Sequence, residues 1–394
     1  MSDSINSGRD GQLEHWYSKE PFDPLSVEKL SPEQEKYYMA SQWKMMWWKF
    51  CRHRLAVISG IILLLFYLST IFAEFLAPYE LHSRNTRNIF APPQSVHIFH
   101  EGELRAPFVY GYRQKLNLDT LQREYRVDKT RIYPLRFFCS GDEYKMWGMF
   151  DADLHLVCAD DQRRATFFWL GTDRLGRDIF SRIIYGTRIS LTIGLIGIII
   201  SFTLGIVLGG ISGYYGGWVD NIIQRTIELL KSLPQLPLWL ALSAALPVTW
   251  SPIWVFFGLS IILGLLDWPG LARAVRSKFL SLREEDFTTA AQLMGASPSR
   301  IIGRHLLPSF ASHLIASASL AVPSMILGET ALSFLGLGLR PPITSWGVLL
   351  NETTNINAVA TTPWLMYPVV PVIIVVLAFN FLGDGLRDAA DPYK

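Results

Sequence analysis

Residues Arg283–Ser309, REEDFTTAAQLMGASPSRIIGRHLLPS, form a polar, helix-forming stretch that lies between strongly apolar runs of the chain. The acidic run Glu284–Asp286 suits a first helical turn, because carboxylates there complement unpaired backbone N–H groups. One face of this helix is predicted from residues at helical spacing: Phe287, Ala290, Ala291 and Met294. The stretch therefore predicts an amphipathic helix whose surroundings decide its role.

A second helix is predicted from the signals that follow. Gly295 suits a helix end in the left-handed conformation, Ser297 suits a side-chain cap, and Pro298 suits a first helical turn. Pro308 is expected to end this second helix. Two interpretations stay open: a capped hairpin that only connects two membrane spans, or a docking element whose small alanines let a partner protein approach closely.

The composition indicates a membrane protein with polar segments. Half of the 394 residues are hydrophobic, 18% are charged, and the mean hydropathy is +0.22. A net charge of +2 without a single basic face gives no indication of nucleic-acid binding. Three cysteines without CxxC spacing exclude a disulfide-rich scaffold and give no metal motif. The polar first fifty residues or so lead us to expect no cleavable signal peptide.

Six membrane spans are expected, so the fold class is an all-α polytopic membrane protein. The expected spans are 55–73, 189–211, a broken helix within 221–247, 253–266, 310–335 interrupted by Pro323, and 367–381. In the second span, Gly205, Gly209 and Gly213 recur every four residues, a spacing that allows close helix packing in lipid.

Candidate residues for a translocation path come from the interrupted and polar parts of these spans. Pro234 and Pro237 are expected to break the third span, and broken helices often border cavities in membrane proteins. Glu329 in the fifth span is costly in lipid unless it faces water or a partner, although a hydrogen bond across the bundle would also satisfy it. Gly205 and Gly209 complete the candidates.

Residues 78–169 form a polar insertion after the first span. Short alternating runs, SVHIF, FVYGY, TRIYPLRFF and LHLVC, predict a small strand-rich domain outside the membrane. Cys139 and Cys158 both lie in this insertion and would form a disulfide in an oxidising compartment, the alternative being two separate buried thiols. Cys51 is expected to be free.

The distribution of basic residues predicts the orientation. Arginines and lysines concentrate beside Arg283–Ser309, which places this stretch and both termini in the cytoplasm and the insertion in the periplasm. The expected organisation is a cytoplasmic segment with an interfacial helix (1–54), a first transmembrane helix (55–77), the insertion (78–169), a permease core with five further helices (170–386, coupling helices about 283–308) and a cytoplasmic tail (387–394).

Several chemistries are absent from the sequence. The chain has no G-x-x-x-x-G-K-[ST] phosphate loop, no H-E-x-x-H and no G-x-S-x-G motif. We therefore expect no ATPase site in this chain. A membrane-embedded enzyme that uses Glu329, His313 and Asp267 lacks a catalytic spacing. A secondary transporter driven by ions would be expected to show matching inverted halves, which we do not find.

These residues resemble the inner-membrane permease subunits of bacterial ABC importers, in particular the second permease of the dipeptide, oligopeptide and nickel group. The resemblance rests on FCRHRLAVISG, LGTDRLGRDIFSRIIYGTRISL, GYYGGWVD, WPGLARAVRSKFLSLRE, ETALSFLGLGLRPPITSWG and LGDGLRDAADP. The cytoplasmic loop of this family reads EAA, three residues, Gly, nine residues, I-x-L-P. Thr289 replaces its glutamate and His305 its isoleucine.

The resemblance implies the type I ABC importer permease fold and an inner-membrane location. It implies a heterodimer with a second permease, two ATPase subunits that bind ATP and Mg, and a periplasmic or lipid-anchored substrate-binding protein. Oligopeptides or dipeptides are the expected solutes, with oligosaccharides or another solute as the alternative, because the insertion is longer than typical. The implied ATPase-coupling residues are Arg283, Glu284, Phe287, Thr289, Ala290, Ala291, Met294, Gly295, His305, Leu307 and Pro308.

Overall fold

The computed structural model describes residues 40–116, 118, 123–159 and 166–390. Residues 46–394 belong to one compact unit. The described chain begins with helix α2 (Gln42–Arg52), followed by α3 (Arg54–Ile71) and the short α4 (Ala73–Leu76). His53 caps α3, because its side chain accepts a hydrogen bond from the Ala56 backbone N–H at 3.1 Å.

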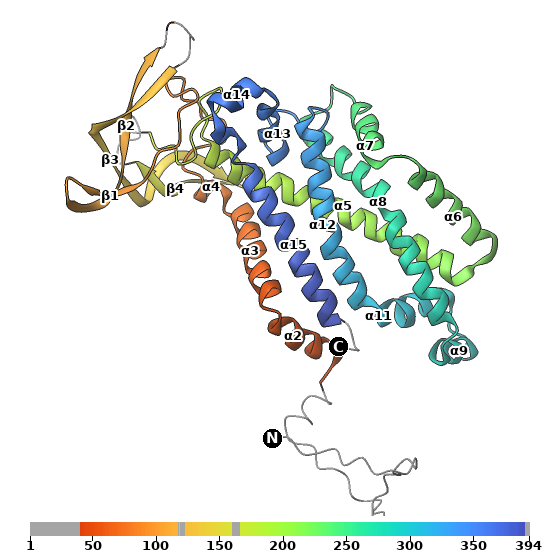
Figure 1. Cartoon of the computed structure of the whole chain (residues 1–394). Coiled ribbons are helices and arrows are strands. Elements are labelled where there is room, and N and C mark those ends of the chain that lie inside the picture. The colour runs from red at the N-terminus through yellow and green to blue at the C-terminus, as the bar shows by residue number, and fades with distance from the viewer. Residues whose placement is uncertain (1–39, 117, 119–122, 160–165, 391–394) are drawn as a thin grey trace, which may run out of the picture. The chain divides into compact units, whose positions relative to one another are not determined.

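Within the described residues, five helical segments are long and apolar enough to cross a membrane. These are α3, α5 (Ile179–Tyr215), α8 (Pro252–Arg283), α12 (Ala311–Phe334) and the segment 363–390, which contains η3 (Pro363–Met366) and α15 (Val369–Ala390). Helix α3 packs on α15, α15 on α12, α12 on α5, and α5 on α8 (Figure 1). Helix α3 also contacts α5, and α12 also contacts α8, so the spans form one closely packed bundle.

The expected third span is not one helix. Helix α6 (Gly217–Ser232) ends at Leu233, and Pro234 is the N-cap residue of α7 (Gln235–Ala244), an apolar helix of only 10 residues. The break predicted at Pro234 is therefore present, and Pro237 lies in the first turn of α7. The described chain thus has five long spans plus this short apolar helix, where the sequence predicted six.

Three other boundaries differ from the prediction. Helix α5 begins at Ile179, ten residues earlier than expected, because Asp178 caps it and its arginines find buried acidic partners. Helix α8 continues to Arg283 through Pro269, so the short span predicted at 253–266 is part of a 32-residue helix. Helix α12 also runs uninterrupted through Pro323.

The remaining helices connect these spans. They are α9 (Asp286–Leu293), α10 (Pro298–Arg300), the π-helix η1 (Ile301–Leu306), α11 (Leu307–Ser309), α13 (Trp346–Asn351), η2 (Glu352–Thr354) and α14 (Ile356–Thr361).

The insertion contains a four-stranded antiparallel sheet, as the alternating runs predicted. Its strands are β1 (His97–His100), β2 (Glu103–Leu116), β3 (Arg123–Met146) and β4 (Phe150–Ala159), in the spatial order β1-β2-β3-β4. A register shift between Tyr110 and Gly111 bends β2 against β3. Beside it, Arg113 pairs with Asp128 at 2.7 Å, and hydrogen bonds from Thr130 and Arg113 lower the pKa of Asp128 to about 2.

The glycines of α5 determine how closely α8 approaches. A Cβ atom at Gly209 would lie 2.5 Å from the Ala272 carbonyl oxygen, and one at Gly213 would lie 2.8 Å from the Arg276 carbonyl oxygen. A Cβ at Gly205 would lie 2.8 Å from the Leu271 side chain. Real Cβ atoms do not approach other atoms so closely. At the observed separation of α5 and α8, these three positions therefore accommodate no residue other than glycine.

We predict that Gly209→Ala destabilises the protein by about 1–3 kcal/mol, because the added methyl group forces α5 and α8 apart. Gly303→Ala is the matched control, since no atom lies within 4 Å of a Cβ at Gly303. The free energy of unfolding in detergent, measured for both variants, checks this. Equal stability of the two variants would show that the helices do not meet at Gly209.

Candidate functional site

The first candidate site is α9 and its connection to the end of α8. Thr288 is fully buried, and its hydroxyl group donates a hydrogen bond to the Leu282 carbonyl oxygen at 2.8 Å. Ala291, 2% exposed, packs in a hydrophobic cluster with Phe279, Ile301 and residues of neighbouring helices. These two contacts hold one face of α9 against the bundle, so the opposite face points outward.

The outward side of α9 carries a row of apolar side chains. Leu293 is 85% exposed and Met294 is 81% exposed, while Phe287 and Ala290 are exposed beside them. We call Phe287, Ala290, Leu293 and Met294 the α9 surface. Large apolar side chains at such exposure are characteristic of an interaction site, because leaving them in water is unfavourable. The geometry therefore suits docking of a partner, whereas a simple connector would not need this surface.

Some predictions for this stretch are confirmed and others are wrong. Gly295 adopts a φ of +78°, so the helix ends there in the left-handed conformation as predicted. Only Asp286 of the acidic run lies in the first turn, because Glu284 closes α8 and Glu285 precedes α9. Thr289 is exposed, and Ala291 faces the core, whereas the sequence suggested an exposed face.

The second half of the stretch also differs from the prediction. Pro298 begins α10 as expected, but the Ser297 side chain contacts Ser299 and caps no backbone N–H group. The helix continues through η1 and passes Pro308 before it ends at Ser309, because α11 accommodates the proline in its first turn. His305 and Leu307 are half-buried, and Pro308 is exposed.

The end of α8 that carries α9 is tied to its neighbours by charged groups. Arg276 donates two hydrogen bonds to Asp220 of α6, and Ser212 of α5 donates a third to the same carboxylate. Arg283 donates to the Tyr214 carbonyl oxygen at 3.2 Å. Helices α5, α6 and α8 are therefore joined next to α9, so that a displacement of α9 would reach all three.

The second candidate site is Glu329, which is fully buried in α12. Its carboxylate accepts hydrogen bonds from Ser345 at 2.6 Å, Ser333 at 2.8 Å and Ser190 at 3.3 Å. The three serines in turn accept hydrogen bonds from backbone N–H groups of Val348, Leu339 and Trp346. One carboxylate thus holds α5, α12 and the loop before α13 together. Within the described chain it is enclosed by hydroxyl groups.

The other translocation-path candidates are dispersed. Pro234 and Pro237 are exposed at the break between α6 and α7. Gly205 and Gly209 are buried against α8, so their observed contacts are those of helix packing. The structure therefore brings none of these four residues into contact with the Glu329 cluster. The role of all five in a path stays a prediction.

A buried ionic cluster was missed by the sequence analysis. Asp173 accepts hydrogen bonds from Arg177 at 2.7 Å and from Arg182 at 2.5 Å, and both arginines also contact Glu352. These groups connect the LGTDRLGRD segment and the start of α5 to η2, which is distant in sequence. Only the unusual charge density of this segment indicated such partners. The paired charges explain why α5 starts so early.

The insertion meets the bundle through α4. Arg188 of α5 forms a bidentate ion pair with Glu74. Its Nη1 donates to Oε1 at 2.7 Å, and its Nη2 donates to Oε2 at 2.8 Å. Burial acts to raise the pKa of Glu74, but hydrogen bonds, that from Arg188 foremost, hold it below its ordinary value. Cys139 and Cys158 form a disulfide between β3 and β4 with Cα atoms 6.3 Å apart, and Cys51 is a free, exposed cysteine.

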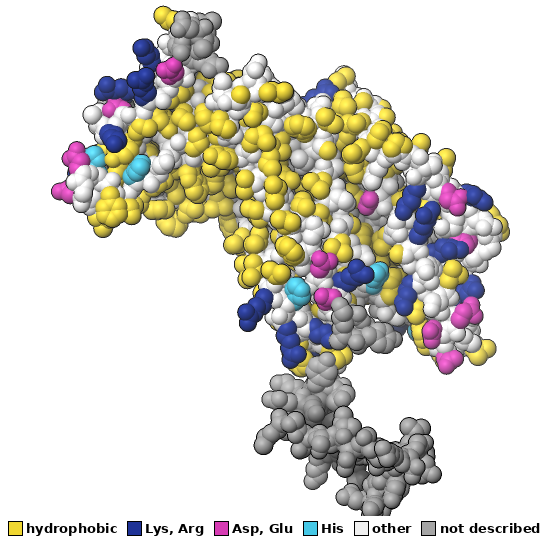
Figure 2. Space-filling model, viewed as in Figure 1, with side chains coloured by type: hydrophobic (Ala, Val, Ile, Leu, Met, Phe, Trp, Pro, Cys, Tyr) yellow, Lys and Arg dark blue, Asp and Glu magenta, His cyan; other side chains and the backbone are white. Residues whose placement is uncertain are grey.

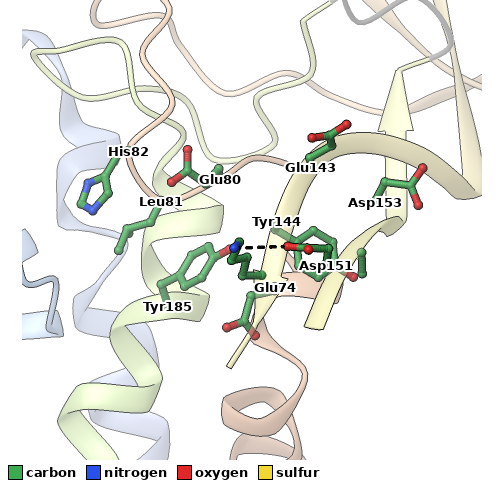
Figure 3. A pocket seen from close by; sticks show the side chains of 11 residues that line it. Glu74, Glu80, Leu81, His82, Glu143, Tyr144, Asp151, Asp153 and Tyr185 are labelled. Atoms are coloured by element: carbon green, nitrogen blue, oxygen red, sulfur yellow. Dashed lines mark ion pairs between the residues drawn. The ribbon is translucent and has the colours of Figure 1, made fainter. Parts of the chain in front are cut away.

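A cavity of about 750 Å³ lies between α4, α5 and the sheet (Figure 3). Five carboxylates line it: Glu74, Glu80, Glu143, Asp151 and Asp153. Lys145 pairs with Asp151 at 3.6 Å, which leaves an excess of negative charge. Among the described residues, no group of three or more His, Cys, Asp or Glu side chains could hold a metal ion. The excess charge disfavours an anionic ligand.

Comparisons with known proteins agree on one family. The family model described as "Binding-protein-dependent transport system inner membrane component" matches residues 205–393. The model described as "N-terminal TM domain of oligopeptide transport permease C" matches residues 41–93. Neither match includes most of the insertion.

Three relatives illustrate the similarity. A "Putative peptide permease protein" of Brucella suis is 40% identical over 225 residues, which cover 57% of this chain and 72% of the relative. The "Dipeptide transport system permease protein DppC" of Alkalihalophilus pseudofirmus is 40% identical over 226 residues, covering 57% and 71%. The "Oligopeptide transport system permease protein OppC" of Haemophilus influenzae is 39% identical over 243 residues, covering 61% and 75%.

We predict that Glu329→Ala lowers the free energy of unfolding by about 2–4 kcal/mol, because three buried serines lose their acceptor. Glu329→Gln keeps one acceptor oxygen and the side-chain volume, so this variant should lose clearly less free energy of unfolding. Thermal or denaturant unfolding of both variants in detergent measures this. Equal, unchanged stability of both variants would contradict the role of Glu329 in holding the loop.

Proposed function

Because this chain belongs to the family of binding-protein-dependent transport system inner membrane components, we propose that it couples ATP hydrolysis by partner subunits to solute import through α9. It is a permease, which makes it a transport subunit, since in ABC importers the ATPase is a separate subunit. The observation that carries the proposal is the exposed, apolar α9 surface at the end of a helix that runs through the bundle.

The partner that fits the α9 surface is an ABC ATPase. One face of α9 is fixed to α8 by Thr288 and Ala291, so a groove that binds the other face would move α8 with it. The Asp220–Arg276 pair and the Arg283 contact carry such a movement to α6 and α5. Of the coupling residues expected from the resemblance, Phe287, Ala290 and Met294 belong to this surface. Thr289 is exposed where the family has glutamate, so here a hydroxyl group would meet the ATPase.

We propose a membrane arrangement of the type I importer fold with six crossings. Helices α6 and α7 would together form the crossing that the break at Leu233 divides. Because basic residues concentrate near α9, we infer that α9 and both termini face the cytoplasm and that the chain lies in the inner membrane. The insertion then lies in the periplasm, an oxidising compartment in which the Cys139–Cys158 disulfide persists.

The complete importer would contain a second permease, two ATPases with ATP and Mg, and a periplasmic or lipid-anchored binding protein. Peptides are the proposed solutes, because the relatives described above are named as peptide, dipeptide and oligopeptide permeases. The solute would pass between the two permeases, with Pro234, Pro237 and the glycines of α5 near the helices that move. ATP-dependent uptake of labelled dipeptides and longer peptides into proteoliposomes tests the function directly.

We predict that Leu293→Asp combined with Met294→Asp releases the ATPase subunits, because a charge replaces the most exposed apolar part of the α9 surface. Copurification and ATP-dependent uptake should each fall by about tenfold or more, a change of about 1.4 kcal/mol or more in binding. Ile356→Asp is the control, since Ile356 is also 81% exposed but lies on α14. Retention of ATPases and uptake by the double variant would refute the proposal.

A second prediction concerns Gly295, which has a φ of +78° and no atom within 4 Å of a Cβ built on it. Gly295→Val should strain the end of α9 by about 1–3 kcal/mol without a clash, so ATP hydrolysis continues while uptake falls. Gly295→Asn should retain uptake, because asparagine tolerates the left-handed conformation. Parallel ATPase and uptake assays distinguish the two. Full uptake by the valine variant would argue against transmission through this turn.

A further inference from the structure

The hairpin between β3 and β4 has an apolar tip. Residues 146–150 read MWGMF and contain no charged or hydrogen-bonding side chain except the Trp147 indole. Met149 is 69% exposed, Phe150 61% and Trp147 49%. Polar residues and glycine normally dominate exposed turns, because they satisfy the backbone and favour water. Four large apolar side chains in five consecutive residues at an exposed hairpin tip therefore indicate a nonaqueous surrounding.

The backbone at this tip makes the choice of tryptophan more unusual. Trp147 and Gly148 both have positive φ, 53° and 73°, a conformation that bulky residues rarely adopt. The hairpin between β1 and β2 provides a comparison within the same sheet. There Glu101 and Gly102 adopt φ values of 50° and 89°, and glutamate occupies the position that tryptophan has in the other hairpin. Both tips have two consecutive residues of positive φ, but they differ in polarity.

The apolar tip is fixed to the end of the first span. The Trp147 indole N–H donates a hydrogen bond to the carbonyl oxygen of Ile71, the last residue of α3, at 2.9 Å. This oxygen is one of the last carbonyls of a helix, which lack partners within the helix. The exposed Phe138 ring lies 6.1 Å from Phe75 of α4, which follows α3. The hairpin thus has a defined height relative to the bundle.

That height corresponds to the boundary of the hydrocarbon core. Helix α3 has 18 residues and is about 27 Å long at 1.5 Å per residue, close to the thickness of the core. Its exposed side chains include Ile61, Leu64, Leu65, Leu68 and Ile71. In Figure 2, hydrophobic side chains cover the lower margin of the sheet and continue onto the neighbouring helices. The apolar tip therefore extends an apolar surface that begins on a membrane span.

We propose that the β3–β4 hairpin tip, Met146–Phe150, inserts into the interfacial region of the lipid leaflet on the insertion's side of the membrane. Tryptophan prefers this region because its ring is apolar and its N–H group is polar, and Met149 and Phe150 would contact acyl chains. The hairpin anchors the sheet to the membrane beside α3. The inference rests on the membrane-spanning assignment and does not depend on coupling through α9.

Site-directed fluorescence tests the proposal on the permease in its complex, reconstituted in phosphatidylcholine vesicles. Cys51→Ser removes the free, exposed cysteine, and labelling without reductant leaves the Cys139–Cys158 disulfide closed. A fluorophore is attached at Met149→Cys and, as the matched control, at Glu101→Cys, whose native side chain is 85% exposed. Quenching by lipids that carry a nitroxide near the headgroup is compared with quenching by aqueous iodide.

We expect lipid nitroxides to quench most of the emission at position 149 and little at position 101, with the opposite order for iodide. Trp147→Asn suits the positive φ and should shift the label at position 149 toward iodide quenching while the protein stays folded. Iodide quenching of equal strength at both positions would overturn the proposal. Protection of position 149 from both quenchers would also overturn it, because a protein partner would then cover the tip.

Discussion

The close contact between α5 and α8 is the constraint on which the rest of the structure depends. Gly209 and Gly213 let the backbone of α8 approach so closely that a methyl group would collide with its carbonyl oxygens. In lipid, where apolar side chains gain little by leaving the solvent, such backbone proximity and van der Waals contact are the main source of helix association. Helix α5 carries the buried ionic cluster, and α8 carries α9. The contact between α5 and α8 therefore connects the ionic cluster at the start of α5 with α9 at the end of α8.

Buried polar groups then position the segments between the spans. The three serines that donate to the Glu329 carboxylate accept hydrogen bonds from the backbone N–H groups of Leu339 and of Trp346 and Val348 at the start of α13. Gly347 lets the start of α13 lie against α12, since a Cβ there would be 2.7 Å from the Thr330 carbonyl oxygen. The Asp173 cluster fixes η2 in the same way. Charged residues in these spans thus hold loops in place and allow the helices to remain in contact.

Much of the fold could be predicted from local patterns. Hydropathy located the five long spans, Pro234 located the break between α6 and α7, and Gly295 located the end of α9. Alternation located the strands of the insertion. Of the predictions that failed, some concern side-chain contacts, such as the Ser297 cap and the exposure of Ala291, and the others concern helix boundaries. Helix α5 starts early because Arg182 and Arg188 have acidic partners that lie about 170 and 114 residues away, which no local pattern contains.

The sequence by itself determined the class of protein, the five long spans and the helical character of Arg283–Ser309, because hydropathy and turn residues act over a few neighbouring positions. The tertiary structure decided which side chains meet. It placed Ala291 in the core and Leu293 in solvent, enclosed Glu329 with serines from α5, α12 and the following loop, and fixed Trp147 to the end of α3. Each of these outcomes depends on contacts between elements far apart in the chain, and only packing in three dimensions selects them.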